Sequence, residues 1–191
     1  MGPRSQAQPR GRAEPVEAEM PLGRYLASTE KRVRDRAIRS LAAFVLMRAQ
    51  EGGLSMSPAE LSKLWKGLFY CFWMSDKPLV QQQLAQELSE LVLMVAGIDT
   101  RSDEAQVASL RHALAALDFY QGFWHTMQAE WLGGDKFRID KYYLLMRRFL
   151  QAGCQLLLVY GCDALLVERY VHIMRGTDGP LSSNNVHVPD S

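Results

Sequence analysis

The residue types that carry most catalysis and metal binding are scattered along this chain of 191 residues. The candidates for chemistry are Cys71, His112, His125, Asp140 and Cys154, with two pairs that could act together, Asp118 with His125 and His112 with Glu104. No HExxH, GxSxG or phosphate-binding glycine loop surrounds them, so no motif brings a nucleophile and a base together. We expect His125 to cap or fill the space between helices, and we predict that the protein is not an enzyme.

The three cysteines, Cys71, Cys154 and Cys162, are odd in number, lie in apolar segments and form no CxxC pair. A disulfide framework needs paired cysteines, and a structural zinc site needs closely spaced ligands. The sequence therefore indicates three core thiols, and it predicts no metal, no cofactor and no small-molecule substrate.

A binding surface is indicated instead by the segment LWKGLFYCFWMSDKPLV, residues 64–80. At helical spacing its apolar residues form one stripe with the preceding Leu61, made of Leu61, Leu64, Trp65, Leu68, Phe69 and Phe72. Lys63, Lys66, Tyr70, Trp73 and Lys77 fall along another. We call Lys66, Tyr70, Trp73 and Lys77 the docking stripe, because exposed Trp and Tyr beside Lys are enriched where proteins or stacked bases bind. A solvated helix face is the alternative.

Two basic groups are further candidates for binding RNA. Arg32, Arg36 and Arg39, called here the arginine row, could contact phosphates, or they could form a solvated face with Glu30 and Asp35 nearby. The second group has the same two interpretations and consists of Arg138, Lys141, Arg147 and Arg148.

The elements that must position these residues are predicted to be helices. Periodicity and capping residues predict helices over 29–48, from Pro58 to a corner at Asp76-Lys77-Pro78, and over 79–96 with Gly97 as terminator. They predict three more: from a Ser102 cap toward Trp131 with a bend near Gly122, over 140–160 with Gly161 after it, and over 164–175 after an Asp163 cap. About six antiparallel helices joined by short corners predict an all-α, HEAT-like stack. Trp65, Phe69, Phe72, Trp124 and Trp131 are the aromatic residues expected in its core.

Composition divides the chain into three parts. Residues 1–19 are rich in Pro, Arg, Gly, Ala and Glu and are expected to be a disordered tail, residues 20–176 the helical domain, and residues 177–191 a linker-like tail. Residues 1–50 contain ten Lys and Arg and five Asp and Glu, so this part is basic. Residues 51–135 contain five basic and eleven acidic residues, and residues 136–191 contain seven basic and five acidic residues. No run of about 18 apolar residues and no signal-peptide core occurs, which favours a soluble intracellular protein without a membrane partner.

Three segments carry a resemblance to a known family: RVRDRAIRSL at 32–41, KLWKGLFYCFWMSDKPLVQQQLAQELSELV at 63–92, and FYQGFWHTMQAEWLGGDKFRIDKYYLLMRRF at 119–149. In this order they resemble successive blocks of the ribosomal RNA-processing protein 1 family, over roughly residues 20 to 190. The match includes the W-K-G-L-F-Y-C and D-K-P elements and the later E-W and D-K-Y-Y elements.

The resemblance implies a non-enzymatic assembly factor of the large ribosomal subunit, located in the nucleus and nucleolus. Its partners would be other assembly factors and precursor rRNA, contacted directly or through those factors. The segment DGPLSSNNVHVPDS at 178–191 resembles the family's linker into a further helix, so we expect the domain to be incomplete at its C-terminal end. A general helical-repeat adaptor for proteins, without RNA contact, is the alternative function.

Overall fold

The computed structural model describes residues 22–50, 56–98, 109–131, 139–177 and 179–182. These segments form seven helices and contain no strand. The helices are α1 (Leu22–Leu26), α2 (Lys31–Gln50), α3 (Pro58–Trp73), α4 (Pro78–Val95), α5 (Leu110–Trp131), α6 (Ile139–Val159) and α7 (Ala164–Arg175). None of the described helices is both long and apolar enough to cross a bilayer.

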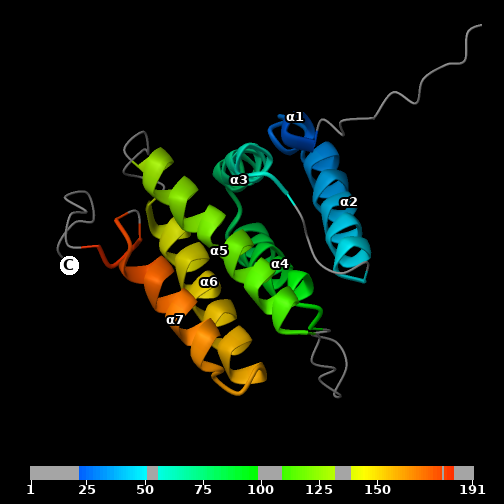
Figure 1. Ribbon diagram of the computed structural model, residues 1–191. Coiled ribbons are helices and arrows are strands. Elements are labelled where there is room, and N and C mark those ends of the chain that lie inside the picture. The colour runs from blue at the N-terminus through cyan, green and yellow to red at the C-terminus, as the bar shows by residue number, and fades with distance from the viewer. Residues whose placement is uncertain (1–21, 51–55, 99–108, 132–138, 178, 183–191) are drawn as a thin grey trace, which may run out of the picture.

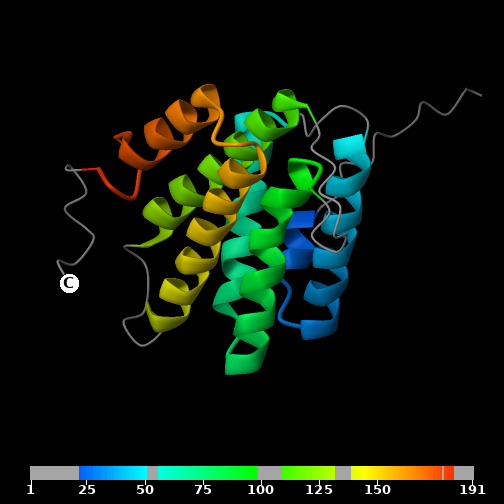
Figure 2. The same ribbon diagram turned by 90° about the horizontal axis from the view of Figure 1, so that it is seen from below.

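The helices are arranged as a two-layer repeat stack (Figure 1). Helices α1, α3, α5 and α7 pack in succession against one another, and α2, α4 and α6 do the same beside them. Figure 2 shows this order as a progression from blue at one side of the molecule to orange at the other. The predicted all-α, HEAT-like stack is confirmed, because the pair α3–α4 packs between the pairs α1–α2 and α5–α6, and α7 packs on α5 and α6.

Local signals set the beginning of α3 as predicted. Ser57 is its N-cap, and its hydroxyl accepts a hydrogen bond from the Glu60 N–H at 3.3 Å, while the Glu60 carboxylate accepts one from the Ser57 N–H at 2.8 Å. Pro58 occupies the first turn, where no intrahelical N–H bond is lost. Hydrogen bonds from the Ser57 hydroxyl and backbone lower the pKa of the Glu60 carboxyl, since they favour its charged form.

Helix ends at four other points also agree with the sequence. Helix α4 begins at Pro78, directly after the predicted corner. Gly97 and Gly161 follow α4 and α6 with φ angles of 72° and 62°, the left-handed conformation that glycine adopts without a side-chain penalty. Asp163 caps α7 by accepting hydrogen bonds from the N–H groups of Leu165 and Leu166.

The core is built on a contact between α3 and α5. The Trp65 indole N–H donates to the Phe119 carbonyl at 2.9 Å, and its ring lies 4.7 Å from the Phe119 ring. A Cβ on Gly122 would fall 2.5 Å from Trp65 Cδ1, so a glycine at this position lets the indole approach the α5 backbone. Phe123 and Phe149 complete the cluster with rings stacked at 3.7 Å. Trp65, Phe69, Phe72 and Trp124 are buried, as predicted.

Several details differ from the expectation or lie outside the described residues. Helix α1 was not predicted, because five residues are too few to show a period. Helix α5 as described begins at Leu110, and the predicted Ser102 cap lies outside the described residues, as do the Trp131 side chain and residues 1–19. Where the linker-like tail is described, the Leu181 N–H donates back to the Met174 carbonyl at 2.9 Å.

The prediction of three core thiols was wrong for two of them. Cys71 is buried, but Cys154 and Cys162 are exposed. Cys154 is an exposed residue of α6, and Cys162 lies in the turn after it with a φ of 55°. Apolar neighbours in the sequence did not show which side of α6 faces the core.

Replacing Trp65 or Phe69 by alanine is expected to lower the free energy of unfolding by about 3 to 5 kcal/mol, because each change leaves a cavity where a large ring was buried. Urea denaturation of the purified variants measures this loss. Lys63→Ala, on the exposed side of the same helix, is the control, with an expected change within about 0.5 kcal/mol. Variants that melt like the wild type and fail only in binding would assign these two residues to an interface.

Candidate docking surface

Helix α3 presents the first half of the docking stripe together with an acidic residue from α5. Lys66 Nζ lies 3.0 Å from Glu130 Oε1, and the Tyr70 hydroxyl donates to Glu130 Oε2 at 3.1 Å. The hydrogen bond to Glu130 raises the pKa of both Lys66 and Tyr70. Because the Lys66 side chain is 59% exposed, this ion pair adds little stability. Its effect is to hold an ammonium group and a phenol ring side by side at the surface.

Sequence reasoning missed Glu130. It is 60 residues from Tyr70, so no helical spacing joins the two residues. The only signal was its place in the E-W element of the family resemblance.

The second half of the docking stripe is less exposed and more dispersed. Trp73 is half-buried and packs against the core, with its ring centroid 6.4 Å from that of Tyr142. Lys77 is exposed at the corner, where it is the N-cap residue of α4 and makes no side-chain capping bond. The structure therefore brings Lys66 and Tyr70 together, makes Trp73 part of both surface and core, and places Lys77 beyond the end of α3.

Lys141, predicted as part of a basic surface group, lies in the interior. Only 7% of the residue is exposed, and Nζ donates to the carbonyls of Trp73 and, at 3.1 Å, of Ser75. These are carbonyls of the last turn of α3 and the residues after it, which no further helical turn can satisfy. A cation is also favoured at this negative end of a helix. This corrects the prediction: the Lys141 ammonium holds the end of α3.

Arg34, on α2, also contacts the end of α3. It is buried, its Nη1 donates to the carbonyls of Ser28 and Thr29 at 2.9 and 3.0 Å, and its Nη2 approaches the Met74 carbonyl to 3.5 Å. Arg34 thus links the turn before α2 to the residue that follows α3. Arg34 lies in the RVRDRAIRSL segment that carries the family resemblance, but the sequence gave no partner for it.

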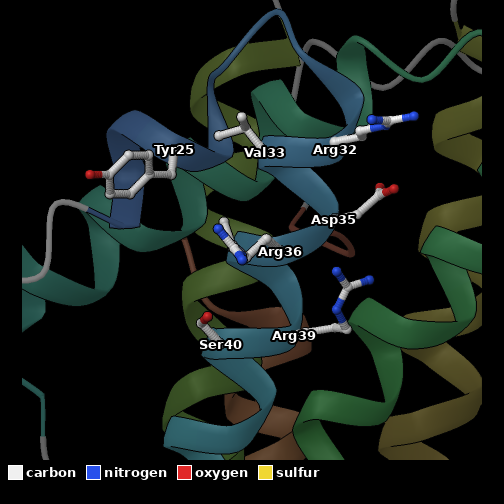
Figure 3. Close-up of a pocket in the computed structure, with 8 residues that line it drawn as sticks. Tyr25, Arg32, Val33, Asp35, Arg36, Arg39 and Ser40 are labelled. Carbon is white, nitrogen blue, oxygen red and sulfur yellow. The ribbon is translucent and has the colours of Figure 1, made fainter.

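The arginine row is exposed along α2 and lines an open cavity (Figure 3). Of the second basic group, Arg147 is exposed and donates to the Tyr143 carbonyl at 3.3 Å. Arg148 is half-buried and donates to Gln151 at 3.2 Å, while Arg138 lies outside the described residues. Binding by any of these residues stays a prediction.

Among the described residues, the candidate catalytic side chains have contacts outside the pairs proposed from the sequence. Burial raises the pKa of the Cys71 thiol to about 11, which disfavours the reactive thiolate. Asp118, paired with His125 in the sequence, binds Arg169 at 2.8 Å instead, and His125 lies 3.4 Å from the Gln121 amide. Glu104 is outside the described residues, within which no cluster of three metal-binding side chains occurs.

Comparison with known proteins gives a consistent result. A family model described as "Nucleolar protein, Nop52" matches residues 17–191. The chain is 36% identical over 156 residues to ribosomal RNA processing protein 1 homolog A of Homo sapiens, covering 82% of this chain and 31% of that protein. It is 42% identical over 140 residues to homolog B of Mus musculus, covering 73% and 17% respectively. The chain spans less than a third of the length of these relatives.

Lys141→Met is expected to destabilise the protein by about 1 to 3 kcal/mol, because it keeps an apolar stem but leaves the Trp73 carbonyl without its charged donor. Urea denaturation measures the change. Arg147→Met, on the exposed side of the same helix, is the matched control and should behave like the wild type. If the Lys141→Met protein had wild-type stability but bound RNA more weakly, Lys141 would be an RNA-contact residue and would not stabilise the end of α3.

We also expect the purified protein to show no nuclease, NTPase or methyltransferase turnover, because no catalytic motif brings the reactive residue types together in the sequence. Assays with RNA, ATP and a methyl donor check this. Turnover that disappears in a His125→Ala or Cys71→Ala variant of unchanged stability would contradict the expectation.

Proposed function

Because the chain belongs to the Nop52 nucleolar protein family, we propose that it acts in the nucleolus as a non-enzymatic scaffold for ribosomal RNA processing and large-subunit biogenesis. The family match and the names of the relatives support a role in ribosomal RNA processing. A helical-repeat stack suits such a role, since it presents extended surfaces on rigid elements. Its partners would be other assembly factors and precursor rRNA.

The observation that carries the scaffold role is the geometry of the docking stripe. An exposed tyrosine next to an exposed lysine, both positioned by Glu130, gives an anchor whose side chains lose little freedom on binding. Tyr and Trp dominate the energy of protein interfaces, and the half-buried Trp73 lies at the end of the same helix. We therefore assign this surface to the contact with a neighbouring assembly protein.

The test separates binding from folding with a Lys66→Gln/Tyr70→Ala double variant. We expect it to melt like the wild type and to leave the large-subunit precursor fractions of a sucrose gradient. The loss should reach at least about 2 kcal/mol, roughly thirtyfold in affinity, if Tyr70 is an interface anchor. Trp73 stays unchanged in this variant because its removal would also disturb the core.

An Arg111→Gln/Gln155→Ala variant is the matched control, since it changes two exposed residues on α5 and α6, away from the docking stripe. It should co-sediment as the wild type does. Unchanged sedimentation of Lys66→Gln/Tyr70→Ala would refute the docking stripe. RNA crosslinking in cells distinguishes the scaffold from a general protein adaptor, because only the scaffold predicts crosslinks to large-subunit precursor rRNA.

A further inference from the structure

An open cavity of about 730 Å³ runs along α2 and plays no part in the docking stripe. Its polar lining consists of Tyr25, Arg32, Arg36, Arg39, Ser40 and Asp35. We propose that this cavity binds single-stranded RNA, with the arginine row on the phosphates and the Tyr25 ring against a base. Tyr25 and the residues Arg32, Arg36, Arg39 and Ser40 are called the RNA cleft below. The proposal rests on the proposed function, which supplies the RNA.

The charges along this part of the chain favour a polyanion. Residues 22–50 contain seven Lys and Arg against two Asp and Glu. One of the two acids, Asp35, is neutralised by Lys31, whose Nζ lies 2.5 Å from its carboxylate. In the described part of the chain, no carboxylate forms an ion pair with a guanidinium of the arginine row. The buried Arg34 makes no contribution at the surface, because its guanidinium points to backbone carbonyls.

The side chains of the cleft lie around α2 in two groups (Figure 3). Arg36 and Ser40 point to the side of the helix where Tyr25 lies, and Arg32 and Arg39 point to the other side. Arg32 and Arg39 are about 10 Å apart along the helix axis, since seven residues separate them at about 1.5 Å each. A strand that crosses α2 can therefore meet successive arginines with its backbone and reach Tyr25 with one base.

The exposed ring of Tyr25 favours RNA over other anions as the ligand of this cleft. Half of its surface, 50%, is exposed, which offers a ready face on which a base can stack. An acidic peptide would use the arginines and leave the ring unused. A duplex keeps its bases stacked inside and presents only its backbone and grooves, so the ring favours an unpaired strand. Arginine also suits phosphate, because its planar fork donates two parallel hydrogen bonds.

Fluorescence anisotropy with a labelled, unstructured 12-nucleotide oligouridylate tests the proposal on the full chain. Arg36→Gln/Arg39→Gln should bind at least tenfold more weakly. The slope of log K against log salt should become shallower by about 1.4, because each of the two phosphates that the variant no longer neutralises accounts for about 0.7 of the slope. Arg111→Gln/Arg175→Gln removes two exposed charges elsewhere and should stay within twofold of the wild type.

The Tyr25 variants separate stacking from charge. Tyr25→Ala should bind several-fold more weakly with an unchanged salt slope, whereas Tyr25→Phe should bind as the wild type does. Equal losses in Arg36→Gln/Arg39→Gln and in the control variant would overturn the proposal, as would wild-type binding by Tyr25→Ala. Competition by polyglutamate or by duplex RNA as strong as that by the single strand would also overturn it and would assign the cleft to that competitor.

Failure here is distinguishable from failure of the proposed function. A wild-type protein that co-sediments with large-subunit precursors but does not bind the oligouridylate would refute the RNA cleft and leave the scaffold role intact. The Lys66→Gln/Tyr70→Ala variant should bind the oligouridylate as the wild type does, because its changes lie on α3 and outside the cleft.

Discussion

The end of α3 is the point on which the arrangement of the stack depends. The chain leaves α3 through Ser75, which is only 4% exposed, so the carbonyls of Trp73 and Ser75 depend on side-chain donors. Lys141 from α6 and Arg34 from α2 supply the donors, and the Gln81 amide adds another to Ser75 at 2.9 Å. A buried cation is tolerated only where it is paired or hydrogen-bonded, so each of these contacts requires the other helices to be in place. The first, second and third helix pairs are therefore joined at one site.

The same helix end fixes what α3 can present to solvent. On its inner side Trp65 fits over Gly122 and donates to the α5 backbone, which allows little rotation of α3 about its axis. With that side fixed, Lys66 and Tyr70 must point outward, and Glu130 from the same α5 meets them there. The packing that stabilises the core thus also determines the position of the docking stripe.

The sequence predicted the features whose causes are local. The Ser57 capping box, the Asp76-Lys77-Pro78 corner, Gly97, Gly161 and the Asp163 cap all act within a few residues, and the structure has each of them as expected. Lys141 and Glu130 could not be placed in this way, because their partners lie 60 or more residues away. A charged residue is expected at the surface until its acceptors are known, which is why Lys141 was assigned there. The prediction that Cys154 is a core thiol was wrong because apolar neighbours in the sequence do not show which side of α6 is buried.

Arg34 connects the two proposed binding surfaces. It belongs to α2, which also carries the arginine row of the RNA cleft. Its guanidinium contacts the carbonyl of Met74, directly after α3, and α3 carries Tyr70. Its bonds to Ser28 and Thr29 also hold the turn that sets α1, and with it Tyr25, against α2. One buried guanidinium therefore fixes the aromatic and the basic parts of the cleft relative to each other and both relative to α3. A scaffold that holds RNA and a protein partner in a constant relative position requires such a rigid connection, since surfaces on independently moving helices would bind both without orienting either.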